Sequence, residues 1–143
     1  MAALGAALAA ALLEKLIIQP QAARRLRRIR HACVRLIERD AVTFARVIKA
    51  TRSKSRRGFR RALKAAIAVP CQVVAHARTI RAASREAVRS VKPQFQSDLR
   101  CALALAVAAE TAARTLVETN LAWLNDPRYA QAVHRRLNRS SVR

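Results

Sequence analysis

The chain has 143 residues, enough for one domain and too few for two. Apolar residues make up 52% and aromatic residues 3%, and two glycines with four prolines exclude an architecture rich in turns. Small aliphatic side chains must therefore fill a core of long helices. We predict an all-α fold, a compact multi-helix bundle of about five helices that forms a single domain over residues 1–143.

The balance of charge is strongly basic. There are 29 Lys+Arg against 8 Asp+Glu, a formal net charge of +21. Such a chain attracts acidic partners, and nucleic acid, an anionic membrane surface and anionic metabolites all fit this charge. Charge alone does not choose among them.

The cysteines number three, an odd count, and none stands in a CxxC pair. Cys33, Cys71 and Cys101 each fall in an apolar helical pattern, where a free thiol acts as a small hydrophobic side chain. We therefore predict structural thiols and a reducing, cytoplasmic location.

Residues 2–19 are predicted to form the first helix, which ends at Pro20. No basic residue precedes the apolar run, and Glu14 and Lys15 follow where a signal peptide would be cleaved. The run is also shorter than the ~20 residues that span a bilayer. We predict a small-residue helix packed closely inside the bundle, and no membrane partner.

A second helix is predicted from about residue 21 to Lys49. Asp40 falls on its apolar stripe, where a carboxylate is costly unless it is paired or hydrogen-bonded. Asp40 is thus either a functional acid or the N-cap of a new helix that begins after a break near residue 39. The predicted stripe consists of Leu26, Ile29, Cys33, Ile37, Phe44 and Ile48.

Residues 51–57 carry no hydrophobic side chain and are predicted to form a flexible basic connection. A third helix follows from about Gly58 to Val91, with a kink or a break expected just before Pro70. Its predicted stripe is Phe59, Leu63, Ile67, Val74, Ala77, Ile80 and Val88.

The segment "PQFQSD" at 93–98 precedes a fourth helix that is predicted to reach about Asn125. Ser97 is suited to be the N-cap and Asp98 to be a first-turn acid, although a helix N-terminus also binds carboxylate or carbonyl oxygens. From Cys101 to Ala109 this helix is apolar nearly all round, as expected for a central buried helix.

The polar residues of this fourth helix, Arg100, Glu110, Arg114 and Glu118, gather on one side, which we take as the solvated side. Asn120 lies on the opposite side and is either a packing device or an amide that orients a ligand. A short basic helix from Pro127 to Asn138 and a tail at about 139–143 complete the chain.

Motifs for metal or nucleotide chemistry are not found in the sequence. The histidines, His31, His76 and His134, show no ligand spacing, and there is no HExxH, nucleophile elbow, Walker loop or dinucleotide fingerprint. We expect no metal.

Several segments together resemble the formiminotransferase-cyclodeaminase / methenyltetrahydrofolate cyclohydrolase family. They include "ALKAAIAVPCQVVAHA", "QFQSDLRCALALAVAAETAARTLVETNLAWLND" and "IERDAVTF", and the opening "AALGAALAAALLEKL" is similar to the family's first helix. The matching motif elements are Val69-Pro70, Ser97-Asp98, Asn120-Leu121, Leu124-Asn125-Asp126 and Asp40 with Thr43.

The resemblance implies a homodimeric helical bundle that acts on one-carbon tetrahydrofolates. Cyclodeaminases expel ammonia from 5-formiminotetrahydrofolate, and cyclohydrolases open the ring of 5,10-methenyltetrahydrofolate with water. Carried over by motif, Asp40 and Asp98 become catalytic carboxylates, and Ser97, Asn120 and Gln94 become substrate-binding residues of one pocket. A tetrahydrofolate derivative is then the substrate, and no metal is required.

The sequence departs from the family at its start, where a Pro-Gly-Gly-Gly-Ser segment is expected before the first helix. Leu116 replaces a second asparagine of the family's long helix. We expect either a true start upstream of Met1 or a reduced or altered activity.

The alternative function is a non-catalytic basic protein that binds nucleic acid or another acidic partner. Its basis is the arginine block at 24–30 and the basic residues between 52 and 64. The same runs also fit an ordinary solvated face.

Overall fold

The computed structural model describes residues 1–53 and 55–139 of the chain. Within that range the elements are α1 (Ala2–Leu16), α2 (Pro20–Arg52), α3 (Arg56–Ala87), the 3-10 helix η1 (Pro93–Phe95), α4 (Gln96–Leu124) and α5 (Pro127–Arg139). The prediction of an all-α bundle is confirmed. Four of the five residues in the predicted tail, 140–143, lie outside the described residues.

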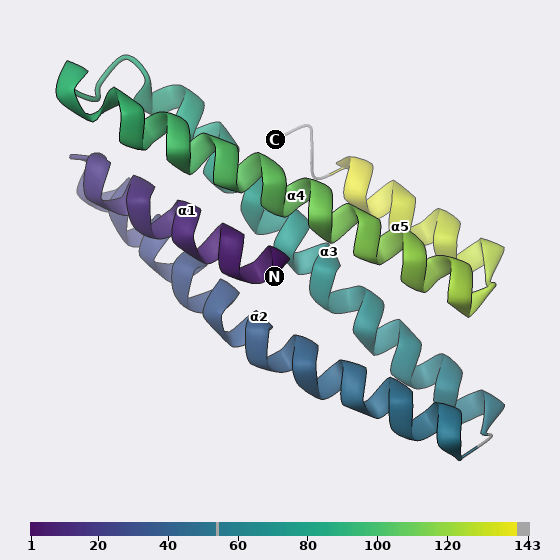
Figure 1. Ribbon diagram of the computed structural model, residues 1–143. Helices are drawn as coiled ribbons and strands as arrows, with labels where there is room; N and C mark the ends of the chain where they lie inside the picture. The colour runs from purple at the N-terminus through teal and green to yellow at the C-terminus, as the bar shows by residue number, and fades with distance from the viewer. Residues whose placement is uncertain (54, 140–143) are drawn as a thin grey trace.

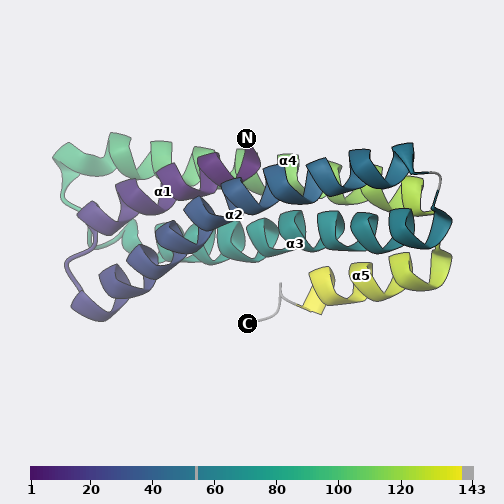
Figure 2. The ribbon, with the colours of Figure 1, turned by 90° about the horizontal axis from the view of Figure 1, so that it is seen from below.

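The long helices form a bundle in which consecutive helices run antiparallel (Figure 1). α3 packs against both α2 and α4, and α1 packs against α2 and α4 on the opposite side (Figures 1 and 2). α5 packs along α3. Because α1 has 15 residues against 33 in α2 and 29 in α4, the second halves of α2 and α4 extend beyond its N-terminus.

Alanine explains how α1 fits between two longer helices. Its buried face is Ala2, Ala3, Ala6, Ala7, Ala9, Ala10 and Leu13. A Cβ built on Gly5 would lie 3.5 Å from the Cβ of Ala109 on α4, so the two helices approach closely. The predicted small-residue helix inside the bundle is therefore confirmed, and none of the described helices is both long and apolar enough to cross a membrane.

The connection between α2 and α3 is shorter than the predicted range 51–57, since Arg52 and Arg56 are both helical. The Ser55 hydroxyl caps α3 by accepting a hydrogen bond from the Gly58 N–H at 3.1 Å. α3 continues through Pro70, so the predicted alternative of a helix break there is wrong.

α2 buries the predicted stripe as far as Cys33 and a different one beyond it. Beyond Cys33 the buried residues are Leu36, Thr43 and Val47, whereas the predicted Ile37, Phe44 and Ile48 are exposed. With the half-buried Asp40 included, the buried positions follow alternating steps of three and four residues, which is the spacing of a helix that packs along a single seam. The sequence predicted the wrong face because larger apolar side chains stand one position after the buried ones, at Ile37, Phe44 and Ile48.

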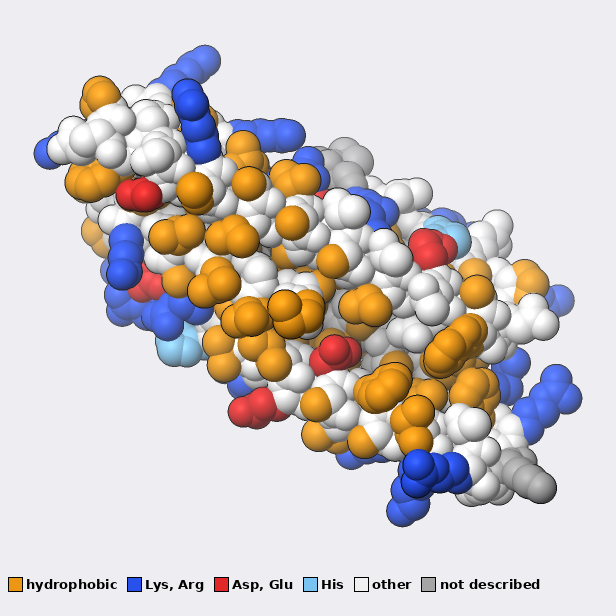
Figure 3. Space-filling view, in the orientation of Figure 1, with side chains coloured by type: hydrophobic (Ala, Val, Ile, Leu, Met, Phe, Trp, Pro, Cys, Tyr) orange, Lys and Arg blue, Asp and Glu red, His pale blue; other side chains and the backbone are white. Residues whose placement is uncertain are grey.

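α4 differs from the prediction in part, since Arg100 and Glu118 are exposed as expected but Glu110 is not. Glu110, expected on the solvated side, is 6% exposed, whereas Val107, Leu116 and Trp123 are exposed. An alanine-rich helix that is apolar nearly all round gives little indication of its buried side. α4 is therefore buried along one face only, and Figure 3 shows the apolar side chains of α1, α2 and α4 spread over one face of the molecule.

The end of α4 is fixed as the "NDP" sequence predicts. Asn125 adopts the left-handed conformation that ends many helices, with φ 47°. The Asp126 carboxylate accepts from the Tyr129 N–H at 3.1 Å and caps α5. Arg60 of α3 donates to the Leu124 carbonyl at 3.4 Å and to Asp126 at 2.8 Å, which ties this turn to the bundle.

Candidate functional site

Three of the predicted site residues lie together at the turn between α3 and α4. Gln94, Ser97 and Asp98 are all exposed there. Asp98 stands in the first turn of α4, as predicted. The prediction that Ser97 is the N-cap is wrong, because α4 begins at Gln96 and its cap position has no side-chain hydrogen bond.

Gln96 fastens this turn instead. Its side-chain amide donates to the carbonyl oxygens of Val88 at 3.2 Å and of Val91 at 2.9 Å, groups that follow the end of α3. The hydroxyl of Ser97 and the carboxylate of Asp98 make no side-chain hydrogen bond within the described residues.

Asp40 occupies a special place on α2. It lies four residues after Leu36 and three before Thr43, so it falls in the register of the buried stripe, and it is half-buried. α2 is continuous, which rules out the alternative that Asp40 caps a new helix. Among the described residues no side chain pairs with its carboxylate, and the Thr43 hydroxyl donates only to its backbone carbonyl, at 3.0 Å.

Asn120 is half-buried near the end of α4 and makes no side-chain hydrogen bond within the described part of the chain. Asn120 belongs to the last part of α4, which extends beyond the N-terminus of α1, as the last part of α2 also does (Figure 1). Asp98 is 22 residues from Asn120 on the same continuous helix, or ~33 Å at ~1.5 Å per residue. A single protomer therefore does not bring Asp98 and Asn120 into one pocket.

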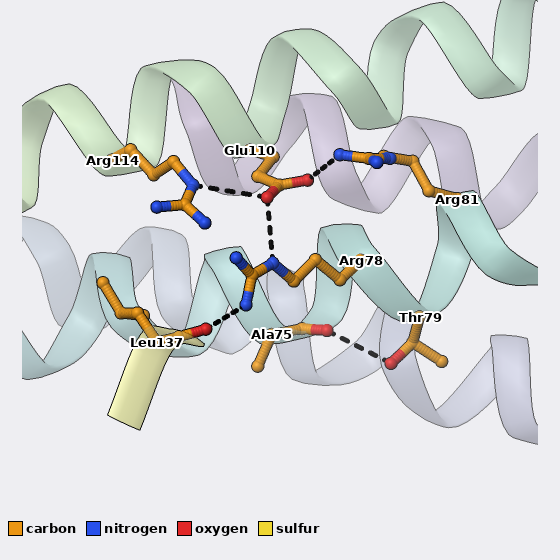
Figure 4. Close-up of polar contacts among 7 residues, drawn as sticks. All are labelled: Ala75, Arg78, Thr79, Arg81, Glu110, Arg114 and Leu137. Carbon is orange, nitrogen blue, oxygen red and sulfur yellow. Dashed lines mark hydrogen bonds and ion pairs between the residues drawn. The ribbon is translucent and has the colours of Figure 1, made fainter. Parts of the chain in front are cut away.

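A second polar cluster, which was not predicted as a site, surrounds Glu110. Arg78 of α3 donates to the Glu110 carboxylate at 2.9 Å, Arg114 of α4 donates at 3.3 Å, and Arg81 of α3 pairs with its other oxygen (Figure 4). Arg78 also donates to the Leu137 carbonyl of α5. One carboxylate thus joins three helices through guanidinium groups.

The ionisation of Glu110 reflects two opposing effects. Burial raises the pKa of the carboxyl group, while the hydrogen bonds from Arg78 and Arg114 and the positive charges of Arg81 and Arg78 lower it. The net shift of the pKa is downward, so Glu110 stays ionised near neutral pH. Its negative charge is fully engaged by the neighbouring arginines.

A cavity of about 720 Å³ opens beside this cluster. The first turns of α2, the last third of α3 and Glu110 of α4 form its wall. The lining residues are Gln19, Gln21, Ala22, Arg25, Leu26, Arg78, Thr79, Arg81, Ala82, Ala83, Arg85, Glu86 and Glu110.

None of the five predicted site residues lines this cavity. The arginine block at 24–30 and the basic positions of α3 were visible in the sequence, but only as a charged surface. Their convergence depends on the antiparallel packing of α2 against α3, which local patterns do not encode. The one available signal was the (i, i+4) pair of Glu110 and Arg114, and the structure confirms that pair.

The cysteines and the possible metal ligands are less suited to a functional site. Cys33 and Cys71 are buried and Cys101 is exposed, and burial raises the pKa of the Cys33 thiol to about 11. Within residues 1–53 and 55–139, no group of three or more His, Cys, Asp or Glu side chains could hold a metal ion.

The fold matches a solved structure, and the sequence matches a family model. No curated protein matches the chain by sequence. The crystal structure of formiminotetrahydrofolate cyclodeaminase from Thermotoga maritima has the same fold, with a TM-score of 0.89 at 20% identity over 97% of this chain and 77% of that one. The sequence model of the formiminotransferase-cyclodeaminase family matches residues 18–139. The chain therefore belongs to the formiminotransferase-cyclodeaminase family.

Proposed function

We propose that this protein is a folate one-carbon enzyme, a 5-formiminotetrahydrofolate cyclodeaminase or a 5,10-methenyltetrahydrofolate cyclohydrolase. The observation that carries the proposal is the state of Asp40. In a chain of net charge +21, a half-buried carboxylate on a core-facing register has no arginine or lysine partner within the described residues. Such a carboxylate is available to a cationic substrate.

Both reactions pass through a cationic amidine-like carbon and require proton transfer at nitrogen. An unpaired carboxylate stabilises that cation and relays protons, and a free side-chain amide hydrogen-bonds the pterin edge. We assign the first role to Asp40 and Asp98, and the second to Asn120 with Ser97 and Gln94. No metal enters this scheme.

A homodimer is part of the proposal. Since Asp98 and Asn120 are ~33 Å apart along one helix, they serve a common pocket only if different copies of the chain supply them. The exposed apolar side chains of Phe44, Leu116 and Trp123 offer surface for such an association. The free buried thiols of Cys33 and Cys71 fit a cytoplasmic dimer.

Turnover of the folate substrates tests the proposal directly. We expect the purified protein to change the near-ultraviolet absorbance of 5-formimino- or 5,10-methenyltetrahydrofolate faster than the uncatalysed reaction does. Asn120→Ala is expected to raise the KM, because it removes an orienting amide. A protein that neither binds nor converts either compound at millimolar concentration would contradict the proposed function.

Mixing of variants tests the shared pocket. Asp98→Asn and Asn120→Ala proteins, assayed at a substrate concentration far below the raised KM so that each alone turns over little substrate, should regain about a quarter of wild-type activity when their subunits are exchanged, since half of the dimers then hold one intact site. A dimer that regains no activity contradicts the assignment of these two residues to one pocket.

A further inference from the structure

The cavity beside Glu110 has the dimensions of a small-molecule site. Its volume of about 720 Å³ lies within the ~300–1,000 Å³ usual for ligand pockets. Side chains from α2, α3 and α4 contribute to its wall, so the cavity is a product of the tertiary fold rather than of one helix surface.

The wall of the cavity carries excess positive charge. Four arginines, at positions 25, 78, 81 and 85, stand against two glutamates, at positions 86 and 110, which leaves a formal charge of +2. Glu110 is already engaged by Arg78, Arg81 and Arg114. Glu86 is exposed and, within the described residues, makes no ion pair.

The arginines keep donors that the protein does not use. The Nε of Arg81 is buried and has no hydrogen-bond partner within the described residues. Neither Arg25 nor Arg85 has a carboxylate partner in that part of the chain. Because protein atoms enclose the Arg81 Nε–H, the donors available to a ligand in the cavity are those of Arg25 and Arg85 and the outer N–H groups of Arg81 that Glu110 does not engage.

We propose that this cavity is a binding site for a small anion that carries at least two carboxylate or phosphate groups. Arg25 and Arg85 bind one anionic group, and the outer N–H groups of Arg81 that its ion pair with Glu110 leaves free donate to the other. The planar fork of the guanidinium group matches both carboxylate and phosphate oxygens. The N-terminus of the 33-residue helix α2, at Gln21 and Ala22, adds favourable backbone dipoles to the same wall.

The wall of this cavity contains none of the residues proposed for folate chemistry. Arg25 and Asp40 are 15 residues apart on α2, or ~22 Å along the helix axis. Loss of folate turnover therefore does not decide whether the anion site exists, and an absence of anion binding leaves the proposed turnover untouched.

Calorimetric titration of the full chain with pyrophosphate and, separately, with citrate tests the proposal. We expect one of these probes to bind at a 1:1 ratio with a Kd below 1 mM at moderate salt. The probe that binds more tightly identifies phosphate or carboxylate as the preferred group. Arg25→Gln/Arg85→Gln should weaken that binding by about tenfold or more and should fold normally, because neither side chain has a carboxylate partner within the described residues.

Arg46→Gln/Arg61→Gln is the matched control, with one exposed arginine removed from each of the same two helices and outside the cavity. It should change the Kd by less than about twofold, since it alters only the long-range charge. Failure of both probes to bind at 1 mM overturns the proposal. An equal loss of affinity in the two double variants also overturns it, because that result indicates general attraction to a basic surface.

Discussion

Glu110 and Asp40 are two carboxylates on core-facing positions of the same basic bundle, and their surroundings differ completely. Glu110 lies where α3, α4 and α5 meet and has three arginine partners. Asp40 lies on α2 with no such partner among the described residues. With 29 Lys+Arg in the chain, the absence of a partner reflects the placement of Asp40 rather than a shortage of cations.

The comparison separates a structural acid, Glu110, from the acid that we propose to be functional, Asp40. A carboxylate whose charge is fully engaged holds helices together and has little capacity left for a substrate. A half-buried carboxylate without a cation contributes little to stability and can interact with a ligand. The two residues should therefore respond to substitution in opposite ways.

Replacement of Glu110 should have the largest effect on stability. Glu110→Gln leaves Arg78 and Arg81 without their counter-charge and should lower the free energy of unfolding by about 3 kcal/mol. Chemical denaturation measures this loss. Glu86→Gln on exposed surface is the control and should cost less than about 0.5 kcal/mol. A Glu110→Gln protein as stable as the wild type would mean that the cluster does not hold the helices together.

Truncation of a buried side chain of α2 should have the next largest effect on the free energy of unfolding. Leu36→Ala should lower the free energy of unfolding by about 2 kcal/mol or more, because Leu36 is 4% exposed. Ile37→Ala, at the neighbouring position with 38% exposure, should cost less than half as much. Equal losses in denaturation experiments, or a reversed order, would contradict the observed buried stripe and favour the stripe predicted from the sequence. The position of Asp40 relative to the core would then differ as well.

Acid should weaken the fold through the paired carboxylates. The pKa of Glu14 is lowered by its hydrogen bond from Arg27, and that of Glu110 is lowered by its arginines despite burial. A carboxyl whose pKa is lower in the folded state stabilises the protein above its unfolded value of about 4.5 and loses this contribution as the pH falls further. Unfolding measured between pH 6 and pH 3 should show this decline, and the decline should be shallower in Glu110→Gln.

The smallest expected effect concerns the reactivity of the three cysteine thiols, which depends on the same burial pattern. Cys101 is exposed and should react with a thiol reagent in the folded protein. Cys33 and Cys71 are buried, and burial raises the pKa of both thiols, so they should react only after denaturation. Three fast-reacting thiols would contradict the orientation of α2 and α3.

The helices could be predicted because their signals are local. The low content of glycine and proline, the prolines at 20 and 127, and the "NDP" turn fix where helices begin and end, within a few residues of the structure. The buried faces of α4 and of the second half of α2 could not be predicted in the same way. Ile37 and Phe44 are larger and more apolar than Thr43, and an alanine-rich α4 differs little from side to side.

Only part of the candidate site could be predicted from the sequence. Asp40 is conspicuous in the sequence because a carboxylate interrupts an apolar pattern, and the structure keeps it in the register of the buried stripe. The wide separation of Asp98 and Asn120 needed the structure, because it depends on α4 being a single continuous helix. The arginine-lined cavity depends on three helices meeting, and no motif marks it.

Folate turnover by Asp40→Asn, measured beside Glu38→Gln, tests the central claim most directly. Glu38 is an exposed acid on the same helix with no ion pair in the described residues, so its replacement makes the same change of charge. We predict that Asp40→Asn keeps the wild-type free energy of unfolding and loses kcat by about 100-fold or more, while Glu38→Gln keeps both. A folded Asp40→Asn protein with wild-type turnover would contradict the assignment of Asp40 to catalysis.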